Sequence, residues 1–298
     1  MDTITYSYCP CCGSDNIFRK LTARDHTVSM EVFEIWYCNL CSVRFTQNIP
    51  DQSSIGKYYQ SENYISHTDT RKGLVNSLYH IIRKKTLHQK QRLIEKFTGS
   101  TNGNLLDIGA GTGAFSSHMK NSGWNVLGLE PDETTRRRAF ELHGISLQSS
   151  GELFKLELAS FDAVSMWHVL EHVHALHDYL DKINKVLKLC GKAFIAVPNY
   201  TSYDAEVYKE YWAAYDVPRH LFHFSPRSMK LLIEKHGMKL ERLLPMWYDS
   251  FYVSMLSEQY KNGSSNNLLA FKNGLLSNFK AAGNNEKCSS VIYVIGKL

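Results

Sequence analysis

A glycine-rich segment that follows an apolar run is the feature that most constrains the fold of this chain. Residues 105–113 have the sequence LLDIGAGTG, so three glycines alternate with small residues between a predicted strand and a predicted helix. Glycine tolerates positive φ and has no Cβ, which allows a tight turn and a close approach of the backbone to a ligand. A glycine loop in this position is typical of nucleotide-binding α/β domains.

The rest of the chain supports this fold class because apolar runs alternate with helical segments. The predicted strands are 104–108, 125–129, 145–149, 161–166, 192–197, 240–244 and 291–295. The predicted helices are 73–97, 113–121, 132–142, 173–188, 226–236 and 267–279. Such alternation implies βαβ units with parallel strands. We therefore predict an α/β fold with a doubly wound, mostly parallel, Rossmann-like sheet of seven strands.

Two acidic residues flank the glycine loop and bear on its ligand. Asp107 stands at the mouth of the loop, and Glu130 follows the next predicted strand, where a carboxylate can accept hydrogen bonds from both ribose hydroxyls. Gly109, Gly111 and Ala114 also fit a dinucleotide fingerprint, so the glycines alone leave the cofactor open. Asp107 would repel a pyrophosphate and suits a cationic ligand that carries an amino group.

Asp107, the three glycines and Glu130 together resemble motif I and its acidic partner in class I S-adenosylmethionine-dependent methyltransferases. Further segments similar to this family are 150–152, 161–164, 167–173, 197–199 and 216–225. The resemblance implies the cofactor S-adenosylmethionine and direct in-line transfer of its methyl group. It places Asp107 at the methionine end, Glu130 at the ribose and Glu152 near the adenine. The implied cofactor-binding residues are Asp107, Gly109, Ala110, Gly111, Gly113, Glu130, Pro131, Glu152 and Trp167.

Residues 168–172 have the sequence HVLEH, which also matches the inverted zinc-protease motif. On one helix, His168 and His172 would share a face and could bind zinc, with Glu171 as base. Because a predicted strand ends just before this motif, we expect the helix to begin near residue 170 or later, so the two imidazoles would not share a face. We expect these residues to line a methyl-transfer pocket instead. The candidate bases are, in order, His168, His220 and His223.

Five of the seven cysteines lie within the first 41 residues. Thiolates two residues apart in a tight turn point at one metal, and two such pairs complete a tetrahedral zinc shell. Cys11 is an additional thiol that could replace either neighbour. The predicted ligands of this structural zinc are Cys9, Cys12, Cys38 and Cys41. A zinc ribbon ahead of such a domain, followed by Tyr58, Tyr59 and Tyr64, resembles sugar C-methyltransferases and their relatives.

We divide the chain into a zinc ribbon at 1–48, a tyrosine-rich linker with basic helices at 49–98, and a methyltransferase domain at 99–298. The last contains two insertions, 199–225 and about 249–288. The first insertion is rich in tyrosine and follows the fifth predicted strand. Ligands of doubly wound sheets bind at the carboxyl ends of the strands, so we expect this insertion to cap the substrate.

Charge separates the functional alternatives. Eight Lys and Arg residues lie between Arg71 and Lys96 with a single glutamate, while the rest of the chain is close to neutral. We interpret this basic segment as a solvated helix face. Contact with RNA is the alternative, and would make the protein an RNA methyltransferase that also uses the zinc ribbon. A non-catalytic cofactor-binding module is the second alternative.

The primary prediction is a cytoplasmic S-adenosylmethionine-dependent methyltransferase that acts on a small metabolite or a sugar-type acceptor. No apolar stretch is long enough for a membrane span, and residues 1–10 lack the basic and apolar regions of a secretory signal. The acceptor atom and the oligomeric state stay open at this stage.

Overall fold

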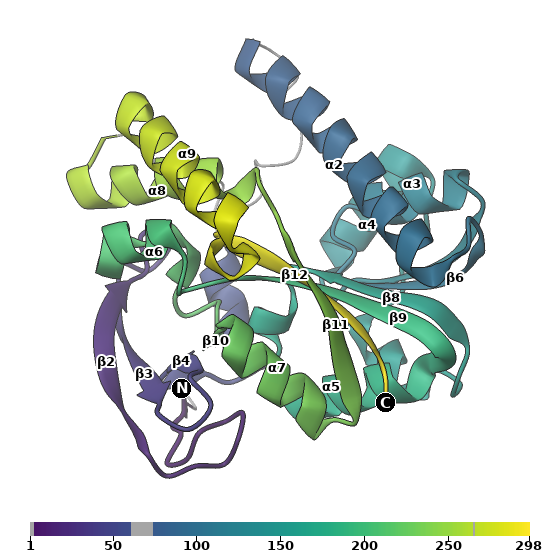
Figure 1. Cartoon of the computed structure of the whole chain (residues 1–298), viewed down its shortest axis with the longest axis horizontal. Helices are drawn as coiled ribbons and strands as arrows, with labels where there is room; N and C mark the ends of the chain where they lie inside the picture. Colours follow the sequence, from purple (N-terminus) through teal and green to yellow (C-terminus); the bar gives the residue numbers. More distant parts are fainter. Residues whose placement is uncertain (1–2, 61–73, 265) are drawn as a thin grey trace.

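A six-stranded sheet forms the centre of the structure, a computed structural model that describes residues 3–60, 74–264 and 266–298 (Figure 1). Its strands are β6 (Gly103–Ile108), β7 (Trp124–Leu129), β8 (Phe161–Trp167), β9 (Leu187–Pro198), β11 (Met238–Pro245) and β12 (Ser290–Lys297). The order is β11-β12-β9-β8-β6-β7. Strands β7, β6, β8 and β9 are parallel, and β12 is antiparallel to β9 and β11. The predicted mostly parallel α/β fold is therefore confirmed.

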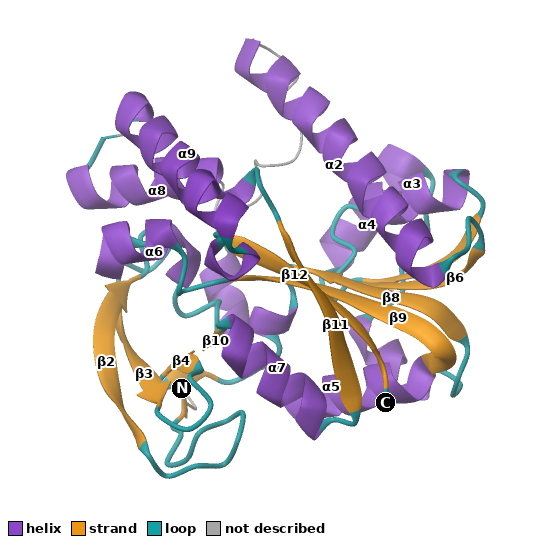
Figure 2. Cartoon of the chain, in the orientation of Figure 1, coloured by secondary structure: helices purple, strands orange, loops and turns teal. Residues whose placement is uncertain are grey.

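Helices cover both faces of this sheet (Figure 2). Successive residues of a strand point to opposite faces, and here both faces carry apolar side chains that the helices bury. The face that packs against α2 (Leu74–Thr98) and α3 (Ala114–Asn121) presents Leu105, Ala163, Phe194 and Val294. The face that packs against α5 (Leu176–Val186) and α7 (Pro226–Lys235) presents their neighbours Leu106, Val164, Ile195 and Ile295. Strands buried on both faces explain the continuous apolar runs in the sequence.

The seventh predicted strand, 145–149, is reduced to a single bridge. Only Gln148 pairs with the sheet, beside Leu129 at the end of β7. The chain turns directly afterwards into a short 3-10 helix, η3 (Ser150–Lys155), so no second pair of residues continues the ladder. The central sheet thus has six strands rather than seven.

A second sheet joins the N-terminal residues to a distant part of the chain. It contains β2 (Ile17–Arg24), β3 (Val32–Cys38), β4 (Arg44–Thr46) and β10 (Phe222–His223), in the order β10-β4-β3-β2. Two short strands, β1 (Thr3–Ile4) and β5 (Ile49–Pro50), pair beside it. Because β10 belongs to the predicted insertion 199–225, the sheet of the predicted zinc ribbon is completed by that insertion.

Both predicted insertions contain helices that pack on each other. The first contributes α6 (Tyr203–Tyr208), and the second contributes α8 (Asp249–Asn262) and α9 (Asn267–Gly283). Ser277 Oγ donates to Asp204 Oδ1 and Asn273 donates to the Tyr208 hydroxyl, so α9 is bonded to α6. The sequence predicted α9 but not α8.

Part of the predicted segment 49–98 lies outside the described residues, including Tyr64, Arg71 and Lys72. Its described elements are the short strand β5, a 3-10 helix, η1 (Ile55–Tyr59), and one long helix, α2. Among the helices that the structure describes, none combines the length and apolarity needed to cross a bilayer.

A buried ion pair ties the N-terminal sheet to the first insertion. Arg219 Nη2 lies 2.9 Å from Asp25 Oδ1, and both side chains are at most 1% exposed. The Asp25 carboxylate also accepts backbone N–H bonds from Thr27, Val28 and Ser29. Burial alone would raise the pKa of Asp25, but Arg219 and these amides outweigh it and hold the pKa well below its ordinary value.

We expect Asp25→Asn to lower the free energy of unfolding by about 3 kcal/mol at neutral pH, because it removes a charge that balances buried Arg219. A carboxyl with a depressed folded pKa stabilises the native state above its unfolded pKa, and this stabilisation is lost as the pH falls through the folded value. In urea denaturation, the free energy of unfolding should therefore fall more steeply with decreasing pH for the native protein than for the variant. Asp15→Asn, at an exposed site in the same region, should stay within about 0.5 kcal/mol. Equal acid slopes in native protein and Asp25→Asn would contradict the assignment.

Candidate functional site

The glycine loop connects β6 to α3 with three residues in the left-handed region. Gly109, Gly111 and Gly113 have φ values of 72°, 54° and 75°. A Cβ on Gly109 would lie 2.3 Å from Val169 Cγ2, and one on Gly113 would lie 2.6 Å from Ile145 Cγ2. Within the described residues, nothing lies within 4 Å of the Cβ position of Gly111. The outer glycines are thus required by packing, and the middle glycine borders open space.

Glu130 lies against this loop, as the sequence predicted for the acidic partner. Its carboxylate accepts hydrogen bonds from the N–H groups of Gly111 (2.9 Å) and Asp132 (3.1 Å). Burial raises the pKa of Glu130, although these amides act in the opposite direction. The neighbouring Ala110 donates its N–H to the Leu129 carbonyl (2.9 Å), which fixes the loop on β7. Pro131 is exposed, and its carbonyl accepts from an arginine of the following helix.

Asp107 lies beneath the loop rather than at its surface. The side chain is 1% exposed, and its two oxygens accept hydrogen bonds from Ser116 Oγ (2.6 Å) and Ser165 Oγ (2.7 Å). Burial raises the pKa of Asp107 against the effect of these hydroxyls. The two serines come from α3 and β8, so the Asp107 carboxylate on β6 links that helix to that strand.

Lys90, on the basic helix α2, lies over aromatic rings near the glycine loop. Its ammonium lies 4.2 Å from the ring centre of Trp167 and 5.8 Å from that of Phe115. Burial lowers the pKa of Lys90 to about 8, although Asp107 and Asp249 favour the charged form. Within the described part of the chain, the Trp167 Nε1 has no hydrogen-bond partner. Lys90 therefore departs from the solvated-face interpretation of this helix.

His168 lies between two carboxylates at the end of β8. Its Nε2 is 2.9 Å from Asp249 Oδ2, and its Nδ1 is 3.4 Å from Glu171 Oε1. Burial lowers the pKa of His168, but the two carboxylates outweigh it and raise the pKa to about 10. His168 is therefore an imidazolium at neutral pH. Asp249 begins α8, the helix that the sequence did not predict.

The zinc-protease arrangement does not form. His168 has a φ of 59°, and only Leu170–His172 are helical, in the short 3-10 helix η4. The imidazoles of His168 and His172 therefore do not share a helix face, as the sequence led us to expect.

A cluster of Glu171, His172 and His220 lies directly beyond His168. Glu171 is fully buried, and its charged neighbour is His168, although neither carboxylate oxygen accepts a well-aligned hydrogen bond from the described residues. His220 Nε2 is 4.0 Å from Glu171 Oε1. The ligand atoms of the three residues lie within 4.8 Å of one another. Burial, and then His220, lower the pKa of His172 to about 4, so this imidazole is neutral.

Two other predicted residues, His223 and Glu152, are not members of this cluster. His223 is 3% exposed on β10, and its Nε2 is 3.1 Å from Thr46 Oγ1. Burial lowers its pKa well below the ordinary value. Glu152 pairs with Lys155 at 2.8 Å on η3. The structure thus gathers His168 and His220 around Glu171, which the sequence analysis considered as a protease base and as part of the segment expected to line a methyl-transfer pocket.

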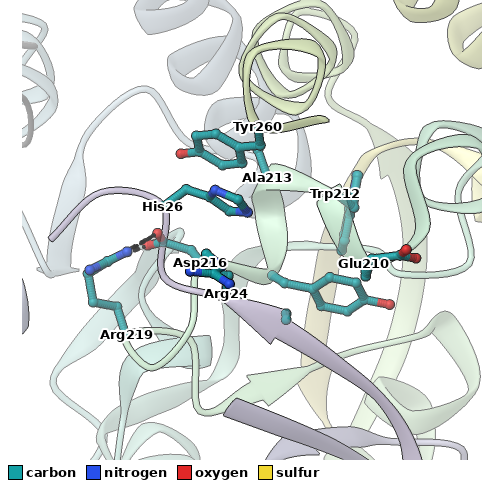
Figure 3. A pocket seen from close by; sticks show the side chains of 10 residues that line it. Arg24, His26, Glu210, Trp212, Ala213, Asp216, Arg219 and Tyr260 are labelled. Carbon is teal, nitrogen blue, oxygen red and sulfur yellow. Dashed lines mark hydrogen bonds and ion pairs between the residues drawn. The ribbon is translucent and has the colours of Figure 1, made fainter. Parts of the chain in front are cut away.

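A small pocket adjoins the cluster between β2, the first insertion and α8 (Figure 3). His26 stacks on Tyr260 with ring centres 4.4 Å apart. Asp216, another lining residue, lies 4.0 Å from His220 Nε2. Three aromatic rings of the insertion, Tyr208, Trp212 and Tyr215, are at most 2% exposed and pack against the protein itself, whereas Tyr203 and Tyr211 are partly exposed.

The four cysteines predicted as zinc ligands converge. The Sγ atoms of Cys9 and Cys41 are 3.6 Å apart, those of Cys12 and Cys38 are 3.5 Å apart, and all four lie within 4.8 Å of one another. A tetrahedral zinc with bonds of about 2.3 Å holds its sulfurs roughly 3.8 Å apart. The donor set therefore fits zinc. Cys11 is buried but is not a member of this group.

Known proteins resemble the chain in the region that carries the loop. A family model described as "Methyltransferase domain" matches residues 79–243. Ubiquinone biosynthesis O-methyltransferase of Bos taurus is 28% identical over 166 residues, 49% of this chain and 44% of that protein. The chain thus spans less than half the length of the bovine relative. The Nitrosococcus oceani protein of the same name is 25% identical over 178 residues, 55% of this chain and 73% of the relative.

Among solved structures, the chain is similar to 1,6-didemethyltoxoflavin-N1-methyltransferase of Burkholderia thailandensis, whose crystal structure contains S-adenosylhomocysteine. The TM-score is 0.50 at 12% sequence identity, and the match covers 92% of this chain and 99% of that one. At this identity the likeness is one of fold.

Proposed function

The chain belongs to the methyltransferase domain family, and from that premise we propose that it is an S-adenosylmethionine-dependent methyltransferase acting on a small-molecule acceptor. The single observation that carries the proposal is the glycine loop, whose open middle residue Gly111 is bonded to the Glu130 carboxylate. S-adenosylmethionine, when bound, supplies an activated methyl group. As a nucleophile forms its bond to the methyl carbon, the carbon–sulfur bond breaks, so alignment of donor and acceptor supplies most of the catalysis.

The proposed cofactor site uses the residues predicted from the sequence. Glu130 would accept hydrogen bonds from the ribose hydroxyls, and the partly exposed Ala110 and Gly111 would border the nucleoside. Trp167 would lie beside the sulfonium, and the Lys90 ammonium lies over its ring, 4.2 Å from the ring centre. Glu152 stays the proposed neighbour of the adenine, and buried Asp107 supplies negative charge beneath the methionine end.

The proposed acceptor is a hydroxyl of a small metabolite or sugar-type compound. The names of the bovine and Nitrosococcus relatives support an oxygen acceptor. Methylation of a hydroxyl releases a proton, and we assign its removal to the region of His168, Glu171 and His220. His168 already holds a proton between two carboxylates, and His223 is buried against Thr46. The cluster around His220 is therefore the proposed place of proton removal.

We further propose that Cys9, Cys12, Cys38 and Cys41 hold one structural zinc. Four thiolates fill a tetrahedral shell and leave no position for substrate. We also propose the cytoplasmic location that the sequence analysis predicts.

Calorimetric titration with S-adenosylmethionine, S-adenosylhomocysteine and NAD tests the cofactor assignment. We expect binding of the first two and none of NAD. Glu130→Ala should weaken binding at least tenfold, whereas Glu133→Ala, at the exposed start of α4 (Glu133–His143), should not. No binding of S-adenosylmethionine would overturn the proposal. Tight, steeply salt-dependent RNA binding would favour the RNA alternative, and cofactor binding without turnover of hydroxylated acceptors would favour the non-catalytic module.

The charge of Lys90 should make cofactor affinity depend on pH. Below its pKa of about 8 the ammonium over Trp167 repels a second cation, and above that pH the repulsion is lost. Two charges about 6 Å apart interact by roughly 1–3 kcal/mol at a protein surface. S-adenosylmethionine should thus bind about tenfold tighter at about pH 9 than at about pH 7, by calorimetry.

S-adenosylhomocysteine lacks the sulfonium charge and provides the control, since its affinity should change little over this range. Lys90→Met should remove the pH dependence for S-adenosylmethionine. Lys84→Met, at an exposed site on the same helix, should retain it. The same pH dependence for both ligands would contradict this role of Lys90.

A further inference from the structure

Helix α9 presents large apolar side chains to solvent along one face. Leu268, Phe271, Leu275 and Phe279 recur every three or four residues, so they form a single stripe on the helix. Their exposed fractions are 85%, 60%, 53% and 77%. Single apolar residues at a surface are ordinary, whereas a continuous apolar stripe marks a surface that another molecule covers.

The opposite face of α9 fixes this orientation because its residues are small or polar. Figure 1 shows α8 and α9 together at one edge of the molecule. The side chains of Asn273 and Ser277 donate buried hydrogen bonds to α6. A Cβ on Gly274 would lie 2.8 Å from Phe251 Cδ1, so α8 packs directly on this glycine. Turning the stripe inward would break these contacts, and the stripe is therefore a fixed feature of the surface.

The order of side chains along the stripe is nearly the same in both directions. Phenylalanines lie four positions before and four positions after Leu275, and Leu268 and Ala282 lie seven positions before and after it. In a two-fold symmetric contact, residue i of one copy meets residue j of the other and j meets i. In an antiparallel pair, Leu275 would thus meet its own copy, and Phe271 would meet Phe279. The large Leu268 would lie against the small Ala282.

The area of the stripe suits a contact between two copies. A large apolar side chain presents roughly 200 Å² when fully exposed, so the exposed fractions above correspond to about 550 Å² of apolar surface per copy. Homodimer interfaces are about 65% apolar. Each copy would therefore bury about 850 Å² in total, close to the roughly 800 Å² per partner of a stable, specific interface.

We propose that the chain forms a two-fold symmetric homodimer through antiparallel pairing of α9, with Leu275 on the axis. This pairing is independent of the proposed function. It covers the stripe of each copy with the stripe of the other, and it aligns the two helix dipoles in opposite directions.

The charges near the stripe determine how the dimer responds to salt. Between Glu258 and Glu286 the chain has three lysines and no acidic residue. The Lys280 ammonium lies over the Tyr203 ring of its own copy, 4.4 Å from the ring centre. Lys272 is exposed beside the stripe, so pairing brings like charges of the two copies together. Added salt screens this repulsion and should strengthen the dimer.

Lysines beside an apolar stripe would also suit an anionic lipid surface. Salt distinguishes the two occupants, because it would weaken an attraction between lysines and lipid headgroups. The symmetry of the stripe favours the second copy, since a bilayer surface requires no matching of positions along the helix.

Sedimentation equilibrium of the full chain measures the dimer without any substitution. We expect a reversible dimer with a dissociation constant on the order of micromolar, tighter at about 0.5 M salt than at about 0.05 M. Leu275→Glu should weaken it at least a hundredfold, because it places two carboxylates on the axis. Leu189→Glu, at an 80% exposed leucine of β9, should leave it unchanged. Circular dichroism verifies that both variants are folded.

Disulfide cross-linking tests the register of the pair. The exposed Cys190 is first replaced by serine. Leu275→Cys should then form a disulfide-linked dimer, since facing Cα atoms of helices in contact lie about 3.5–5.5 Å apart, near the range of a disulfide. Phe271→Cys and Phe279→Cys should each stay unlinked alone and link when mixed, because eight residues span about 12 Å of helix.

A native chain that stays monomeric at about 100 µM would overturn the dimer, as would a dimer that Leu275→Glu leaves as tight as before. Linkage of Phe271→Cys to itself would contradict the antiparallel register. A monomer that binds phosphatidylglycerol vesicles, and releases them when salt is added, would assign the stripe to lipid instead.

Discussion

Cys38→Ser is expected to unfold the N-terminal sheet and to release the zinc. Cys38 is the last residue of β3 and is fully buried. Its Sγ lies 3.5 Å from the Sγ of Cys12. Structural zinc contributes about 10–16 kcal/mol of apparent binding free energy in small domains. Loss of one thiolate should therefore cost 5 kcal/mol or more, on the order of the whole stability of a domain. Zinc analysis, thermal melting and limited proteolysis of residues 1–60 measure this.

Two other cysteines provide the controls. Cys190→Ser should behave as the native protein because Cys190 is exposed and outside the cluster. Cys11→Ser should keep its zinc, since the four converging thiols do not include Cys11. If Cys11→Ser released zinc while Cys12→Ser retained it, the ligand set would be wrong.

Gly109→Ala is expected to reduce S-adenosylmethionine affinity at least a hundredfold. A left-handed φ costs a non-glycine residue about 1–2 kcal/mol. The added Cβ would also lie 2.3 Å from Val169 Cγ2, so the loop or the segment that carries Val169 has to shift. That segment leads directly into Glu171, so turnover should fall as well. Calorimetry and melting temperature measure the two effects.

A double variant isolates the cause. Gly109→Ala with Val169→Ala removes the clash and leaves the strained backbone, so part of the lost affinity should return. Gly283→Ala is the matched control, because nothing described lies within 4 Å of its Cβ position and its φ is ordinary. A double variant as weak as Gly109→Ala would show that the clash is not the cause.

Local spacing was sufficient to predict the glycine loop and the four thiols. Positive φ at Gly109 and the closeness of the two thiols within each C-x-x-C pair follow from short motifs whose geometry is set within a few residues. The meeting of Cys9 with Cys41 joins two such motifs and was predictable because one zinc needs four thiolates. Glu130 was also predictable, because the carboxyl ends of neighbouring parallel strands meet at one edge of a sheet.

The cluster around Glu171 could not be predicted in the same way. Glu171 and His172 lie in η4, His220 lies in the first insertion, and the neighbouring Asp249 begins α8. No short motif connects His220 or Asp249 to Glu171. Lys90 gave a weaker signal, since Lys90, Ile94 and Phe97 recur at helical spacing on one stripe of α2. We interpreted Lys90 as part of a solvated face because the segment around it is basic. Its position on an apolar stripe instead indicated that it faces the protein.

The two differences in secondary structure have distinct causes. Helix α8 buries Ser250, Ser254 and Ser257, so its inner face is marked by small hydroxyl residues rather than by an apolar period. The segment 145–149 has the apolar content of a strand, but the turn after Gln148 leaves it one bridge. In both cases tertiary packing determines the secondary structure, which the local sequence does not determine.

The pairing of β10 with β4 has a consequence during translation. Phe222 follows Thr46 by 176 positions in the chain, which a ribosome covers in roughly 10–35 s at about 5–20 residues per second. For that interval the nascent strand β4 has an open edge, the kind of surface that recruits other chains. Arg219, which pairs with Asp25, emerges at the same late stage. The sheet that contains β4 is thus completed only late in synthesis, and nascent chains stopped before residue 222 should be the ones that aggregate.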